Sequence, residues 1–124
     1  MSVQYREGEQ VTVNESTMRS KVAVVYTRPE TVLADVGLAM RMADYQSYLS
    51  PMLSTLLKIN ISWQHFYPAC STTPWQLDGV IKTLKEDSYA SVIPAQNGTV
   101  VVDSYEGEIK NKHLPVIEKH GLSS

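Results

Sequence analysis

The chain has 124 residues, which is enough for one domain with a hydrophobic core, since domains commonly run to roughly 100–150 residues. It is 43% hydrophobic and 19% charged, with a formal net charge of -2. This composition excludes a disordered chain and gives no support for nucleic-acid binding, which usually shows a clustered basic face. No run approaches the roughly 18 apolar residues of a membrane span, and the charged N-terminus lacks the apolar stretch of a secretory signal. A single cysteine forbids an internal disulfide and is typical of a protein in the reducing cytoplasm.

The N-terminal residues 1–20 are mostly polar and are interpreted as a loosely ordered arm or an edge strand, ahead of a single α/β domain over 21–124. The run KVAVVYT, residues 21–27, is β-branched and apolar, which predicts a strand buried on both faces. A helix is predicted to follow, with Thr27 as its N-cap, and to run to about Tyr45.

Three further strands are predicted over 56–63 (LLKINISW), 90–95 (ASVIPA) and 99–103 (TVVVD). A helix over 74–86 is predicted between the first two of these. It starts at Thr73 as N-cap, and its apolar residues recur at helical spacing. A last helix is predicted over about 115–119, with Gly121 as the residue that ends it.

Strands that alternate with helices predict an α/β fold with a mostly parallel, or mixed, sheet flanked by helices. The chain stops directly after a helix cap, where such a fold would normally enter its next strand. We therefore expect the N-terminal part of a larger fold, truncated at its C-terminus. An apolar surface patch would then be left where the absent part would have covered the chain. The expected partner is either the missing C-terminal half or a further copy in a homo-oligomer.

The stretch NISWQHFYPACSTTPWQL, residues 60–77, joins a predicted strand to a predicted helix and contains both tryptophans, the only Phe and the only Cys. Ligands of open α/β sheets bind beyond the carboxyl ends of strands, where this turn lies. Lys58 and Asn60 fall on one face of the strand, opposite its apolar side chains. They are either the solvated face of an edge strand or side chains that point into a ligand crevice.

The helix that begins after this turn presents backbone N–H groups and a partial positive charge, which suit an anion. Ser71, Thr72 and Thr73 add three hydroxyls there, although simple capping needs only Thr73. The aromatic rings of Trp63 and Trp75 either wall a pocket or belong to the core.

Cys70 lies three residues before the N-cap, where a thiol tends to be more reactive, and His65 is a candidate base for it. The alternative is that Cys70 is a small buried hydrophobic residue. His113 and His120 are expected to be exposed, and no zinc or iron–sulfur site can be built from one cysteine.

Two strings carry a resemblance to a known family: LLKINISWQHFYPACSTTPWQL, and the later NGTVVVDSYEGEIKNKHLPVIEKHG. They resemble a bacterial and archaeal group within domain-of-unknown-function family 362, and the similarity covers about 21–122. The resemblance implies an α/β fold in a usually longer protein. Some members carry an added ferredoxin-like domain with four-iron clusters, which implies a redox context. This chain lacks such a cysteine-rich motif, and it has Ser88 where the family usually has Gly at a helix end, a position that calls for positive φ.

Three functions follow as alternatives from these residues. The first is an α/β domain that binds a small anionic ligand in a larger, redox-associated protein. The second is a transferase or hydrolase that depends on Cys70. The third is an assembly module without chemistry.

Overall fold

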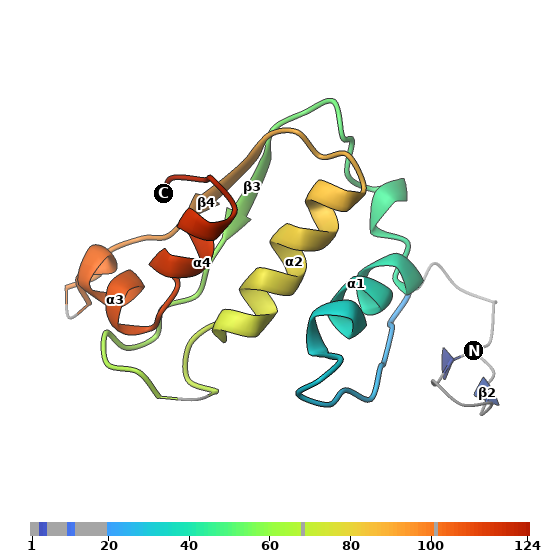
Figure 1. The fold of residues 1–124 in the computed structure, drawn as a ribbon, viewed down its shortest axis with the longest axis horizontal. Coiled ribbons are helices and arrows are strands. Elements are labelled where there is room, and N and C mark those ends of the chain that lie inside the picture. Colours follow the sequence, from blue (N-terminus) through green and yellow to red (C-terminus); the bar gives the residue numbers. More distant parts are fainter. Residues whose placement is uncertain (1–2, 5–9, 12–19, 68, 101) are drawn as a thin grey trace.

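The computed structural model describes residues 3–4, 10–11, 20–67, 69–100 and 102–124. In these residues the chain forms an α/β fold with four α-helices, one short 3-10 helix and two two-stranded sheets (Figure 1). The α/β prediction is confirmed, although the parallel sheet has only two strands.

The elements are, in chain order, β1 (Val3–Gln4), β2 (Gln10–Val11), α1 (Val32–Met42), η1 (Tyr45–Ser47), β3 (Thr55–Lys58), α2 (Pro74–Glu86), β4 (Val92–Ala95), α3 (Ser104–Lys110) and α4 (Leu114–Lys119). The strands β1 and β2 pair in antiparallel orientation. The predicted arm or edge strand covered residues 1–20, and apart from these two strands and Ser20 it lies outside the described residues.

The helices predicted over 74–86 and near 115–119 are confirmed as α2 and α4, and the strand predicted over 90–95 is confirmed as β4. The strand β3 pairs with β4 in parallel, and α2 connects the two, as expected of a βαβ unit. This unit is the centre of the fold.

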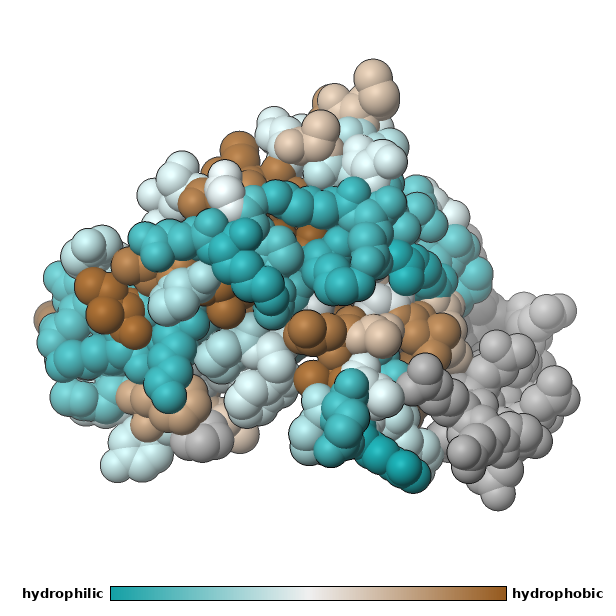
Figure 2. All heavy atoms as spheres, viewed as in Figure 1, coloured by the Kyte–Doolittle hydropathy of each residue, from teal (hydrophilic) through white to brown (hydrophobic). Residues whose placement is uncertain are grey.

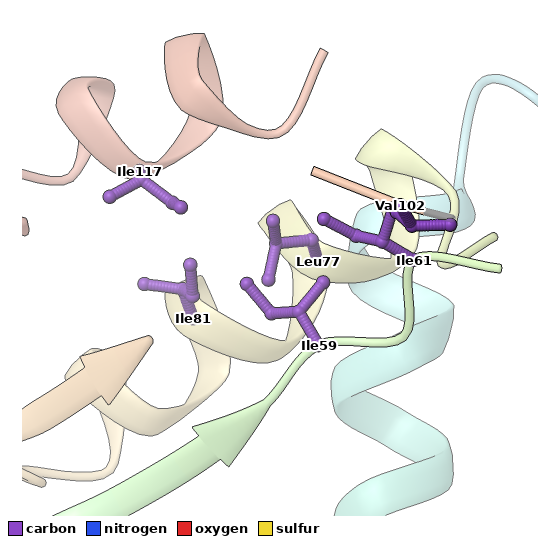
Figure 3. Close-up of a cluster of buried hydrophobic side chains, with 6 residues drawn as sticks. All are labelled: Ile59, Ile61, Leu77, Ile81, Val102 and Ile117. Atoms are coloured by element: carbon purple, nitrogen blue, oxygen red, sulfur yellow. The ribbon is translucent and has the colours of Figure 1, made fainter. Parts of the chain in front are cut away.

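The main core lies between β3 with its extension, α2 and α4. Figure 3 shows the side chains of Ile59 and Ile61 facing Leu77 of α2, with Ile117 of α4 beyond. The cluster consists of Ile59, Ile61, Leu77, Ile81, Val102 and Ile117. Each of these residues is at most 9% exposed, so this core fixes the start of α2 relative to the end of β3.

The predicted strand over 21–27 is wrong, since the structure forms no strand there. The segment lies on the outer side of α1, away from β3 and β4 (Figure 1). Lys21 Nζ pairs with Asp44 Oδ2 at 2.8 Å, and Thr27 Oγ1 donates to Asp35 Oδ2 at 3.0 Å. A β-branched run becomes a strand only where it meets a partner strand, and no described strand lies beside this one.

The helix α1 begins later and ends earlier than predicted. Its N-cap is Thr31 rather than Thr27, and it stops at Met42 rather than near Tyr45. The hydroxyls of Thr27 and Thr31 both donate to the buried carboxylate of Asp35, one turn into the helix. Thr27 therefore bonds to a side chain of the helix and does not cap its backbone.

The predicted strand over 99–103 is also wrong in its described residues. Val102 N donates to Thr99 Oγ1 at 3.1 Å and Thr99 N donates to Val102 O at 3.0 Å, which closes a turn. Asp103 then caps α3, a helix that the sequence analysis missed, because its Oδ1 accepts from Glu106 N at 2.7 Å. Asp followed three residues later by Glu is a capping signal, so the sequence did carry a sign of this helix.

Each of the four described α-helices is followed by a residue in the left-handed region. Gly121 follows α4 with φ of 67°, as predicted, and Leu122 N donates back to Ile117 O at 3.1 Å. Ser88 after α2 and Lys112 after α3 occupy the same position, with φ of 69° and 63°. The expectation that Ser88 stands where positive φ is needed is thus confirmed.

The outer face of the parallel sheet carries exposed apolar side chains. Leu56 and Ile93 lie opposite each other and are 67% and 45% exposed. On the face seen in Figure 2, a hydrophilic band covers the C-terminal half of α2, and hydrophobic side chains reach the surface beside it.

Candidate functional site

The turn between β3 and α2 brings two short segments together, residues 60–62 and residues 71–72. Asn60 N donates to Thr72 Oγ1 at 3.1 Å, and Thr72 N donates to Asn60 O at 3.0 Å. Ser62 N donates to Ser71 Oγ at 3.1 Å. The two hydroxyls thus accept bonds from the backbone beyond the end of β3. Each hydroxyl keeps its own hydrogen as a donor for another group.

The strand β3 is shorter than predicted, because its ladder to β4 ends when Ile59 N donates to Ala95 O at 2.8 Å. The predicted alternation nevertheless continues past this point. Ile59 and Ile61 are 2% and 9% exposed, while Asn60 and Ser62 are exposed. The Asn60 amide donates to Ser62 Oγ at 2.8 Å, so it bonds within its own segment.

The N-terminus of α2 has no side-chain cap. Thr73 is the N-cap, as predicted, but its hydroxyl makes no capping hydrogen bond. Pro74 has no N–H, and the first backbone bond of the helix runs from Leu77 N to Thr73 O at 3.1 Å. The N–H groups at the second and third positions of the helix are therefore left for a ligand or water, at the positive end of a 13-residue helix.

Lys58 lies at the carboxyl end of β3 with an exposed side chain, and its Nζ donates to Ile59 O at 2.9 Å. It lines a shallow hollow of about 110 Å³ together with Thr72 and Gln76. This volume corresponds to a few water molecules, since each takes roughly 30 Å³ in the liquid. The structure therefore brings Lys58 and Thr72 together at the N-terminus of α2. Asn60, Cys70, Ser71 and Thr73 do not line this hollow.

Cys70 is exposed and lies in a turn in which its N–H donates to Tyr67 O at 3.1 Å. The ring of His65 is also exposed and packs near the ring of Trp63, with centroids 5.7 Å apart. In the described part of the turn, no hydrogen bond joins the Cys70 thiol to His65. The thiol is accessible, and among the described residues no hydrogen bond joins it to a base.

The aromatic side chains of the turn lie at the surface. Trp63 is 41% exposed and Trp75 is 46% exposed, and neither lines the hollow beside Lys58. Phe66 and Tyr67 are likewise exposed. These rings form neither the main core nor the wall of this hollow.

Two buried side chains from the corner between α3 and α4 hold the turn, and the sequence analysis missed both roles. Asn111 is 1% exposed, and its Nδ2 donates to Trp63 O at 2.8 Å and to Gly107 O at 2.9 Å. His113, which was expected to be exposed, is fully buried, and its ring Nε2 lies 2.6 Å from Thr72 O. A carbonyl oxygen only accepts, so Nε2 carries the proton of this bond. The NKH string, residues 111–113, was the signal in the sequence that could have pointed to these two roles.

A second expectation about histidine is also wrong, since His120 is half-buried rather than exposed. Its Nε2 lies 2.7 Å from Asp78 Oδ1, and Lys119 Nζ lies 2.7 Å from Asp78 Oδ2. Burial raises the pKa of Asp78, but the hydrogen bonds from Lys119 and His120 outweigh burial and lower the pKa overall. This cluster links α4 to the first half of α2.

Comparison with protein-family models, with curated proteins and with solved structures gives no match. The resemblance to family 362 therefore stays a prediction.

In the described ranges, no group of three or more His, Cys, Asp or Glu side chains is placed to hold a metal ion. One cysteine does not fit an iron–sulfur cluster, which needs several thiolates. None of the described helices has the length and apolarity to cross a membrane.

Proposed function

We propose that the chain is a ligand-binding α/β domain that binds a small anion at the N-terminus of α2, beside Lys58. The observation that carries this proposal is the shared hollow, which Lys58 lines together with Thr72, just before the uncapped helix, and Gln76 in its first turn. A positive side chain and free helix N–H groups are the two features that most commonly bind phosphate and carboxylate groups in proteins.

The charge of Lys58 supports the proposal because no acidic side chain among the described residues pairs with it. Its ammonium group donates to a neutral carbonyl oxygen, and none of the ion pairs in the described residues includes it. An anion in the hollow would therefore gain a full charge partner without breaking a salt bridge. The hydroxyl of Thr72 accepts from Asn60 N and still has a hydrogen to donate to the anion.

The remaining predicted residues take supporting roles in this proposal. Asn60 and Ser71 fix the backbone of the turn, and the Thr73 hydroxyl is a further donor at the helix start. Trp63 and Trp75 flank the turn at the surface. The redox-associated setting rests on the family resemblance alone, and this chain supplies no cluster of its own.

The test is a titration of inorganic phosphate, followed by calorimetry, against the unchanged chain and the Lys58→Met variant. A unit charge pair about 4 Å apart contributes roughly 1 kcal/mol in water, which is about a fivefold change in affinity. We expect Lys58→Met to weaken phosphate binding by about fivefold or more. Because Lys58 is exposed, we expect the variant to keep the melting temperature of the unchanged chain.

Lys85→Met is the matched control. Lys85 is also an exposed lysine whose Nζ donates to a backbone carbonyl, that of His120, but it stands near the C-terminus of the same helix. The control variant should bind phosphate as the unchanged chain does. The proposal fails if Lys58→Met leaves the phosphate affinity unchanged, or if both variants weaken it equally.

The alternative of a Cys70-dependent transferase or hydrolase has one supporting observation, the exposed thiol. A nucleophilic thiol also needs a base within hydrogen-bond reach, and His65 packs on Trp63 instead. Anion binding is therefore the function that the arrangement of these side chains supports better.

A further inference from the structure

The strand β3 has one edge that no described strand occupies. In its parallel ladder with β4, the backbone of Thr55, Leu57 and Ile59 faces β4: Thr55 N donates to Ser91 O and Ile59 N to Ala95 O, both at 2.8 Å. The N–H and C=O groups of the intervening residues, Leu56 and Lys58, therefore face the opposite edge. The described residues offer them no backbone partner.

The opposite edge of the sheet, on β4, is blocked. Val92 and Pro94 are the residues of β4 whose backbone faces away from β3. Proline has no N–H to donate to a further strand, and within sheets it is confined mainly to edges. A third strand therefore has one place to join this sheet, beside β3.

An apolar groove of about 340 Å³ runs beside this free edge of β3. Three residues of β3 line it and none of β4 does, which places it on the side away from β4. Its other walls come from α1, α2 and the loop before β3, with Met40, Leu53 and Val80 among them. Leu53 and Leu56 are 68% and 67% exposed. Apolar surface of this kind, next to unpaired backbone groups, is suited to an added strand.

The same chain contains a segment of strand-forming residues that pairs with none of the described strands. Residues 21–27 read KVAVVYT, and Val22 and Val24 are 67% and 41% exposed. In Figure 1 this segment lies beside α1, and β3 of the same copy lies beyond α2. The ion pair of Lys21 with Asp44 and the bond from Thr27 to Asp35 hold the segment against α1. The segment is therefore held at the surface with the side chains of Val22 and Val24 exposed.

We propose that residues 21–27 of a second copy of this chain dock on the free edge of β3 and extend the parallel sheet by one strand. Leu56 and Lys58 would pair with the backbone of the incoming segment, and its valines would fill the apolar groove. The exchange is reciprocal in a dimer, so that each copy donates one segment and accepts one. The partner of this surface is thus the chain itself.

The test measures the molar mass of the full chain by light scattering across a wide range of concentrations, together with amide hydrogen exchange. We expect a dimer, and protection of the Leu56 and Lys58 amides that rises with the dimer fraction. Val24→Glu should give a monomer because a charge cannot enter the apolar groove. The matched control is Ile109→Glu on α3, since Ile109 is 45% exposed and Val24 41%, and α3 does not line the groove. This control should remain a dimer.

A second measurement does not depend on the folding of a variant. A synthetic peptide of residues 20–28, added in excess, should convert the dimer to monomer by occupying the edge of β3. The proposal is overturned if the unchanged chain is monomeric at every concentration. It is also overturned if both Glu variants dissociate equally, if the peptide has no effect, or if the two amides are equally protected in the monomer. The last result would mean that the chain's own segment occupies this edge.

Discussion

Gly107 is the point at which α3 touches the segment that leads into the candidate site. A Cβ atom on this residue would lie 2.7 Å from Ile61 Cγ2, well inside normal contact, and Ile61 is only 9% exposed. Gly107→Ala therefore forces the buried Ile61 or the helix to move. Overpacking of this kind costs about 1–3 kcal/mol, and the better helix propensity of alanine returns about 1 kcal/mol. We expect a net loss of up to roughly 2 kcal/mol in the free energy of unfolding, measured by urea titration.

The cause of this loss can be isolated with a second substitution. Ile61→Ala removes the atom that the new Cβ would meet, so Gly107→Ala should become stabilising, by about 1 kcal/mol, in that background. Gly98→Ala is the control, because a Cβ at Gly98 would meet no atom closer than 3.8 Å. It should leave stability unchanged or slightly raised. If Gly107→Ala has the same effect with and without the Ile61 side chain, the close contact is not what requires glycine.

Two further predictions concern Ser88, just after α2, and Asp78 within it. Ser88→Gly should raise the free energy of unfolding by about 1 kcal/mol, because glycine adopts the φ of 69° without strain. Ser88→Ala should give no gain, and thermal melts of both variants test the difference. Asp78→Asn should destabilise the chain at neutral pH, because the folded chain lowers the pKa of Asp78. The charged carboxylate therefore stabilises the fold at pH values above its ordinary pKa of 3.8. This contribution is lost as the pH falls through the lowered pKa. Melts should therefore show the difference from the unchanged chain shrinking in strong acid, and a constant difference would contradict the role of the charged carboxylate.

The elements that the sequence predicted well are those with a local signal. The helix α2 combines a proline at its first position, an N-cap threonine and apolar residues at helical spacing, and its predicted bounds were correct. Gly121 and Ser88 were likewise predicted from the local requirement for positive φ. These signals lie within a few residues of the feature that they specify, so no knowledge of the tertiary fold is needed to interpret them.

The predictions that failed depended on partners distant in the sequence. A β-branched run such as residues 21–27 is a strand only if another strand accepts it, and in this structure none of the described strands does. The burial of His113 was also not predictable from its neighbours. Its bond to the Thr72 carbonyl crosses 41 residues, and it exists because the turn after α3 directs the ring toward the start of α2.

The position of His113 also bears on why polar and aromatic side chains are concentrated between residues 60 and 77. The carbonyls of Trp63 and Thr72 are held by Asn111 and His113, while the tryptophan ring itself stays at the surface. The polar residues of the turn first satisfy its own backbone. Among the described residues, Lys58, the hydroxyl hydrogen of Thr72 and the uncapped start of α2 keep the capacity to bind a ligand. Because Lys58 is exposed, its attraction for an anion is screened by salt and is modest. The aromatic residues therefore do not create a dry pocket, and selectivity for the anion must come from the fixed positions of the N–H donors.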